Sequence, residues 1–150
     1  MITFANGKSY KQISVLGAVQ SFQGQLRNTL ALKFLASEIS LAEATELYKD
    51  KDALKEISIA ETYTETELND ENNPVEVNRT RSSVQLNFTL PVELTLSTEK
   101  ISPTESAEII TIKIAQKSAL EIAQEQQAAD ITNIEAALIE LAEMEVTNNG

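Results

Sequence analysis

The chain has 150 residues and a formal net charge of −11, from 23 acids and 12 bases. It contains no Cys and no His, which excludes disulfides and Cys zinc sites and removes the commonest general base and metal ligand. The aromatic share is 5%, with no Trp, so the core of a domain of this size must be mainly aliphatic.

The acidic balance also argues against two classes of partner. A negative surface repels phosphate backbones and anionic membranes, and the densest basic stretch, Asn78–Arg81, holds only two charges. No apolar run approaches the ~18–20 residues of a membrane span, and residues 1–8 lack the pattern of a secretory signal. We therefore expect no nucleic-acid or membrane partner, and a location in the cytoplasm or in a particle assembled there.

The first 35 residues favour strands. Asn6-Gly7 is a strong hairpin signal because both residues tolerate positive φ, and Gly17 and Gly24 mark further turns. Leu30, Leu32 and Phe34 alternate with polar or small residues, which is the period of a half-buried strand.

A short helix is predicted near residues 41–49. Ser40 and Glu43 fit a capping box, in which the two side chains bond the first free amides of a helix, and Leu41, Ala44 and Leu47 give it an apolar stripe. Lys49 to Asp52 break the pattern, and another strand starts at Ile57.

Further strands follow an exposed loop at residues 67–74. Alternating apolar residues from Ser83 to Leu90 predict one strand, which Pro91 interrupts at an edge, a bulge or a strand end. Residues 105–115 predict the last strand. The fold class is therefore α+β, with a mainly antiparallel β-sandwich or barrel-like body over residues 1–115 and the short helix within it.

Residues 116–150 form the second predicted region, a long C-terminal helix near 116–144 followed by a frayed tail from Val146. The predicted helix has no Gly or Pro. Apolar residues spaced by three, four and three form a seam, which passes Gln127 and Gln124 on its way back to Leu120. The predicted interface residues are Leu120, Ile131, Ile134, Leu138 and Leu141. Thr132 to Glu135 match a second capping box, which would split the helix in two.

The charges of this helix are all of one sign. From Ser118 onward there are seven acids and no Lys or Arg, so it gains no Glu–Lys support, and the acids near its end oppose the helix dipole. Its stability must come from covering the Ile/Leu face. The cover is its own β body, identical helices or a basic partner, and the sequence leaves these three open.

Searches for chemistry give weak signals. Paired carboxylates need a cleft that splits their pKa values, whereas the acids here lie in a loop and on a solvated helix. Asn69 to Asn73 is rich in oxygen ligands, but it lacks the EF-hand spacing and central Gly and is more typical of a turn. We predict no catalytic, cofactor or metal residues and no enzyme activity.

The stretch from Asp130 to Glu143 resembles the endings of small virion proteins of tailed phages and prophages of Gram-positive bacteria. The segments Ser14–Gly17, Phe22–Gln25 and Arg27–Leu30 have a more general likeness to the same group. The resemblance implies a structural protein of the tail, baseplate, fibre or head decoration, located in the virion and present in several copies, often as a trimer.

The predicted function is therefore that of a non-enzymatic virion protein. It acts as a homo-oligomer, with a trimer favoured, and through contacts with other virion proteins. The alternative is an acidic DNA mimic that inhibits a nucleic-acid-binding protein. Its helix acids are irregularly spaced, which ranks it second.

Overall fold

The structure, a computed structural model, describes the backbone of residues 1–149 and the side chains of residues 1–145. The chain divides into two compact units, Met1–Gln116 and Lys117–Gly150. The described part of the first unit holds the strands and two short helices, and the second unit is built on one helix, α3 (Ala119–Asn149). No helix in the described residues combines the length and apolar character that a membrane span requires.

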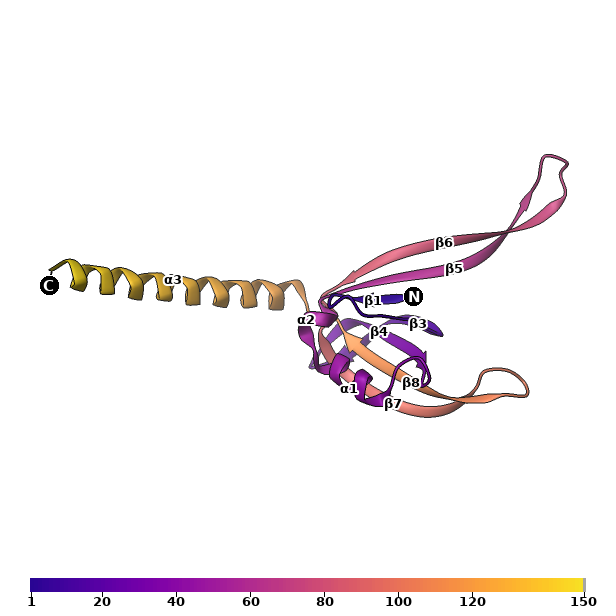
Figure 1. Ribbon diagram of the computed structural model, residues 1–150, viewed down its shortest axis with the longest axis horizontal. Helices are drawn as coiled ribbons and strands as arrows, with labels where there is room; N and C mark the ends of the chain where they lie inside the picture. The colour runs from indigo at the N-terminus through magenta and orange to yellow at the C-terminus, as the bar shows by residue number, and fades with distance from the viewer. Residues whose placement is uncertain (150) are drawn as a thin grey trace. The chain divides into compact units, whose positions relative to one another are not determined.

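The first unit consists of two antiparallel sheets of four strands each (Figure 1). One sheet has the order β2-β1-β5-β6, and the other has the order β3-β4-β8-β7. The strands are β1 (Ile2–Phe4), β2 (Ser9–Tyr10), β3 (Ser14–Phe22), β4 (Gln25–Leu35), β5 (Glu56–Leu68), β6 (Pro74–Leu86), β7 (Leu90–Lys100) and β8 (Ser106–Ala115). This confirms the predicted α+β class with an antiparallel, β-rich body.

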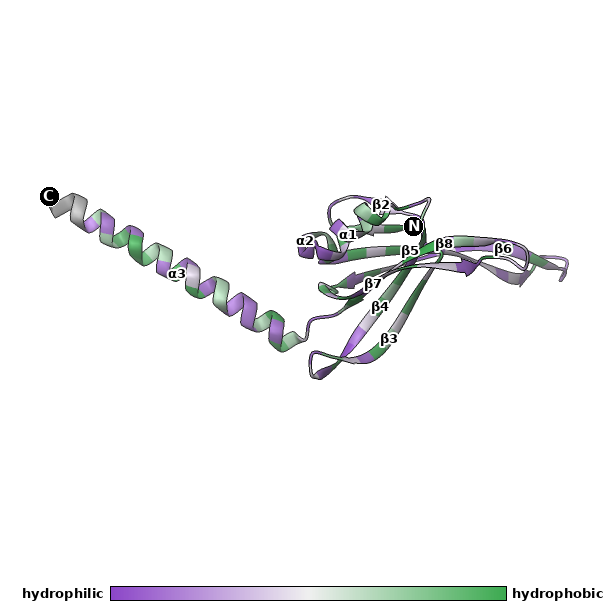
Figure 2. Cartoon of the chain, turned by 90° about the horizontal axis from the view of Figure 1, so that it is seen from below, coloured by the Kyte–Doolittle hydropathy of each residue, from purple (hydrophilic) through white to green (hydrophobic). Residues whose placement is uncertain are grey.

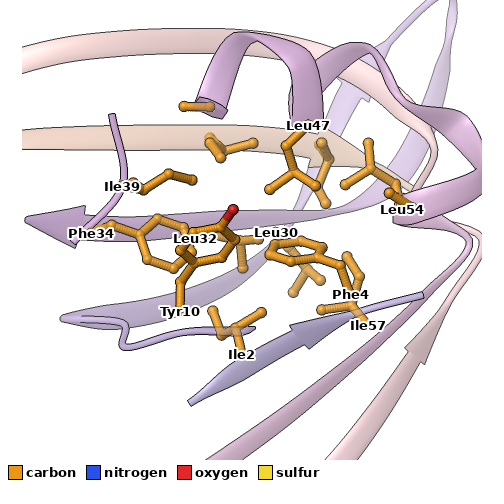
Figure 3. Packing of buried hydrophobic residues seen from close by; sticks show 14 of the residues in the cluster. Ile2, Phe4, Tyr10, Leu30, Leu32, Phe34, Ile39, Leu47, Leu54 and Ile57 are labelled. Atoms are coloured by element: carbon orange, nitrogen blue, oxygen red, sulfur yellow. The ribbon is translucent and has the colours of Figure 1, made fainter. Parts of the chain in front are cut away.

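An aliphatic core lies between the two sheets and the short helices (Figure 3). The first sheet contributes Ile2, Phe4 and Ile57, and the second contributes the alternating residues of β4 and β8, such as Leu32 and Ile112. Tyr10 packs edge-on against both Phe4 and Phe34, with ring centroids 6.2 Å apart in each pair. The period-two pattern of β4 therefore marks the face that the core covers.

Turn residues form the hairpins predicted at Asn6-Gly7 and at Gly24, whereas the turn predicted at Gly17 is wrong, because Gly17 lies within β3 and pairs with Leu30. Gly7, with φ 84°, closes the β1–β2 turn, and Gln23 and Gly24 form a two-residue loop between β3 and β4 with φ 53° and 77°. Two consecutive positive φ values suit the twist of a tight hairpin.

Helix α1 (Leu41–Lys49) has the predicted bounds and the predicted Ser40 cap, but the Glu43 side chain does not bond a free amide as a capping box requires. The Glu43 amide donates to Ser40 Oγ at 3.1 Å, and the hydroxyl of Ser40 donates to Glu43 Oε1 at 3.2 Å. A second helix, α2 (Lys51–Leu54), was not predicted. Asp50 begins it by accepting a hydrogen bond from the Ala53 amide at 3.1 Å, which is a local cap with no apolar period to reveal it.

Two strand predictions need correction. The alternation from Ser83 to Leu90 does not form one strand: β6 ends at Leu86, Asn87 has φ 65°, and β7 begins at Leu90. The loop predicted at 67–74 is shorter, because β5 runs to Leu68 and β6 starts at Pro74. The prediction for Pro91 is confirmed, since β7 is an edge strand with a register shift between Pro91 and Glu93.

The β5–β6 hairpin extends well beyond the core (Figure 1). Ile57 and Ile59 are buried, whereas both faces are largely exposed from Thr62 onward. Beyond the core, Arg81 pairs with Glu61 at 3.0 Å, and Arg79 pairs with Glu65 at 2.9 Å and with Glu67. Exposed pairs of this kind contribute little stability each, so backbone pairing supports this part of the hairpin.

Candidate interaction surface

Helix α3 begins at a reciprocal cap. The Ser118 amide donates to Glu121 Oε1 at 2.9 Å, and the Glu121 amide donates to Ser118 Oγ at 3.2 Å. Lys117, the last base of the chain, pairs with Glu125 across the first turns. The start of α3 is therefore fixed by side chains of its own unit.

The helix continues through the point where a break was considered. The hydroxyl of Thr132 donates to the Ala128 carbonyl at 3.0 Å, a bond back along the same helix, so Thr132 does not cap a new one. Backbone helix also continues through Val146–Asn149, where fraying was expected. Gly150 of the expected tail lies outside the described residues. At 1.5 Å per residue, this one element is about 46 Å long.

All five predicted interface residues lie on α3 and are exposed. Ile131, Ile134, Leu138 and Leu141 form the seam and are 50–60% exposed, and Leu120 is 67% exposed. The helix thus presents four large aliphatic side chains on adjacent turns, spaced for the facing holes of another helix.

Exposure alone does not single out the seam. Ile139 and Met144, which the sequence reasoning left out, are 61% and 60% exposed. Ile139 follows Leu138 by one residue and so points about 100° away from it. Figure 2 shows hydrophobic and hydrophilic residues mixed along the helix. Spacing, and not exposure, separates the seam residues from their neighbours, and only a partner that covers more than the seam would involve the others.

Charge divides unevenly between the two units. Residues 1–116 carry sixteen acids and eleven bases, a net charge of −5, whereas the much shorter unit of residues 117–150 carries seven acids and one base, Lys117, a net charge of −6. Three of the seven lie outside the seam and its flanks, at Glu125, Glu140 and Glu143, and Glu121 flanks Leu120. Asp130 and Glu135 flank the first apolar turn of the seam, and Glu145 occupies the next seam position after Leu141. A partner that packs on the seam therefore meets negative charge at both ends of the seam. Between these ends, the residues that flank the seam are mainly Ala.

Residues weighed for chemistry lie in ordinary surroundings. Asn69 Oδ1 accepts hydrogen bonds from the amides of Glu71 and Asn73 at 3.0 and 2.9 Å, which closes the β5–β6 turn. No group of three or more potential metal ligands gathers within the described residues.

Surface pockets lie on the first unit. One, of about 430 Å³, contains the single acid Glu61, which is paired with Arg81. Another, of about 350 Å³, is lined by neutral residues that include Asn28 and Gln116. Neither pocket brings two carboxylates together.

Comparisons of the chain with protein-family models, curated proteins and solved structures give no match.

Proposed function

We propose that this chain is a non-enzymatic structural protein of a tailed-phage particle, and that it works by assembling with copies of itself through α3 and with other virion proteins. The observation that carries the proposal is the exposed seam of Ile131, Ile134, Leu138 and Leu141. The phage setting rests on the resemblance of residues 130–143.

The seam supports a helical oligomer over a solitary helix. Most helix stability in proteins comes from packing one face, and α3 has no Lys or Arg after Lys117 to stabilise it by ion pairs. Ile131 and Ile134 occupy both seam positions of one heptad, a pattern that shifts preference from two strands toward three or four. Gln124 and Gln127 supply polar layers, which lower stability but fix the register.

The test is the oligomeric state of the whole chain. Size-exclusion chromatography with light scattering should give a trimer, or a larger assembly built from trimers, at micromolar concentration, and the variant Ile134→Asp/Leu138→Asp should lose the α3 contact. Its β-sheet circular dichroism and its melting transition should remain, because the core lies in residues 1–116. Ile139→Asp is the matched control, since it adds one charge to an equally exposed position off the seam. A strictly monomeric wild type, or a β body that melts with the seam variant, would contradict the proposal.

The acidic DNA mimic remains a second candidate because residues 118–150 carry seven acids and no base. A mimic binds a basic protein by charge, so its binding should weaken steeply with added salt. A 1:1 complex with a basic DNA-binding protein that dissociates between about 0.05 and 0.2 M salt would favour this candidate.

A further inference from the structure

Strand β3 differs from the other sheet edges in having no protection against pairing. Open edges offer free backbone groups, and natural proteins block them with charges, Pro, bulges or very short strands. β2 has two residues. β7 has Pro91, a bulge and charged residues, and β6 has Pro74, Glu76 and two Arg. Beyond Ala60, where β1 no longer pairs with it, β5 is also an open edge, and this part carries three Glu.

In contrast, β3 is nine residues long, has no charged residue and no Pro, and pairs with β4 in unbroken register. Arg27 is the one charged residue from Gln12 to Leu32. The residue is 5% exposed, and its guanidinium donates to the carbonyls of Phe22 and Gln116. The surface around β3 is therefore neutral apart from Lys33, which lies opposite Ser14 and pairs with Glu99, in a chain whose net charge is −11.

The hydrogen-bond pattern identifies which β3 groups face outward. The Gln116 amide donates to the Asn28 carbonyl, which places Asn28 on the β8 side of β4. The N–H and C=O groups of successive residues point to opposite sides of a strand, so the backbone groups of Thr29 point toward β3. Those of its partner Ala18 therefore point toward β4. The backbone groups of Val15, Gly17, Val19 and Ser21 consequently point away from the sheet.

Apolar side chains continue past the core on this hairpin. Val19 and Leu26 lie on the same face as the buried Leu30 and Leu32, yet they are 63% and 74% exposed. Gly17 lies between Val15 and Val19 on that face, and a Cβ built there would meet nothing closer than 4.0 Å. A neighbouring strand could lay a valine over Gly17 without a clash.

We propose that β3 is a self-pairing edge, at which two copies of this chain join antiparallel about a two-fold axis at Ala18, so that their sheets become continuous. The register that pairs all four outward residues puts Val15 opposite Ser21 and Gly17 opposite Val19 of the second copy. A second copy is the favoured occupant on charge: two chains of −11 repel each other elsewhere, whereas a basic partner would be drawn to the acidic surfaces and not to this neutral one. This inference deepens the proposed function, because it adds a second surface for assembly in the first unit.

Cysteine cross-linking tests the register, since the chain has no Cys of its own. At the axis, Ala18 would oppose Ala18 of the second copy in a non-hydrogen-bonded pair with Cα atoms about 4.5 Å apart, within disulfide range. Gln20 is exposed on the same face, but in this register it lies about 13 Å from its counterpart. Ala18→Cys should cross-link to a dimer at least tenfold faster than Gln20→Cys under mild oxidation. Equal rates, or no dimer from either folded variant, would overturn the proposal.

The experiment is run in the Ile134→Asp/Leu138→Asp background, so that α3 assembly and β3 pairing are separated. There, Val19→Lys should raise the dimer dissociation constant at least tenfold by sedimentation velocity, and Val84→Lys, on the charged β6 edge at 55% exposure, should leave it unchanged. If the Ile134→Asp/Leu138→Asp protein stays monomeric and its Ala18→Cys form does not cross-link, the proposal of β3 pairing is overturned, even if wild type forms the α3 trimer. A wild type that dimerises only through β3 overturns the α3 proposal and leaves this one standing.

Discussion

Leu138 and Ile139 offer a matched test of the α3 seam. They are adjacent, 60% and 61% exposed, and each can be replaced by Ala, the best helix former. Only Leu138 lies on the seam. If copies of α3 meet there, Leu138→Ala should weaken assembly and Ile139→Ala should not.

The size of the effect follows from the exposed surface. Fully burying a Leu side chain contributes about 1.5–3 kcal/mol. Because Leu138 is 60% exposed before assembly, covering the rest contributes about 1–2 kcal/mol per chain. Three chains lose about 3–6 kcal/mol per trimer, which lowers the trimer association constant by roughly two to four orders of magnitude.

Sedimentation equilibrium over a wide concentration range measures that constant directly. Circular dichroism at 222 nm on the same samples controls for loss of helix. Equal weakening by the two variants would mean that the partner covers α3 all round, and no weakening by Leu138→Ala would mean that the seam is not an interface. Either result refutes the seam argument.

Three further predictions concern charge, core and pH. Raising salt from about 0.05 to 0.5 M should strengthen self-association, measured by light scattering, because it screens repulsion between acidic helices; weakening would mean that ion pairs between the copies hold the assembly together. Leu32→Ala, at a fully buried position, should lower the free energy of unfolding in urea by about 2–5 kcal/mol, whereas Leu26→Ala on the same strand should change it by less than about 0.5 kcal/mol. Burial and a hydrogen bond to Glu43 raise the pKa of Tyr10 above 10.0. The folded state then holds the phenol proton more tightly, so this contribution to stability is complete below pH 10 and is lost as pH rises through the folded pKa. Tyr10→Phe should therefore reduce the fall in melting temperature between pH 9 and 11, without abolishing it, because burial and Glu93 also raise the pKa of Tyr48.

The elements that could be predicted from the sequence are those whose signals are local. Ser40 and Glu43 mark the start of α1 because a cap needs only four residues, and the alternation of Leu30, Leu32 and Phe34 marks a strand with one covered face. The strand predicted from Ile57, with Thr62 to Thr64 continuing it, is β5, but its outer end at Leu68 could not be found from apolar alternation. From Thr62 onward both of its faces are exposed, so no apolar alternation arises.

Val84 and Leu86 led to the wrong prediction of one strand from Ser83 to Leu90 for a related reason. Their period matches that of Phe88 and Leu90, but Val84 and Leu86 are exposed and Phe88 is buried. The turn at Asn87, with φ 65°, separates two strands that belong to different sheets. Only tertiary structure decides which side of a strand is covered.

The seam of α3 was found from spacing, whereas the β3 edge was not found at all. Its signal is an absence of charge: one charged residue from Gln12 to Leu32 in a chain that is 23% charged. That signal acquires meaning only when β3 is known to be an edge, because a neutral strand in the middle of a sheet needs no protection. The two surfaces therefore place different demands on the chain. The seam requires a covering face to stabilise an acidic helix, and the edge requires partners for four outward backbone positions. Pairing copies of the same chain at both surfaces would meet both demands.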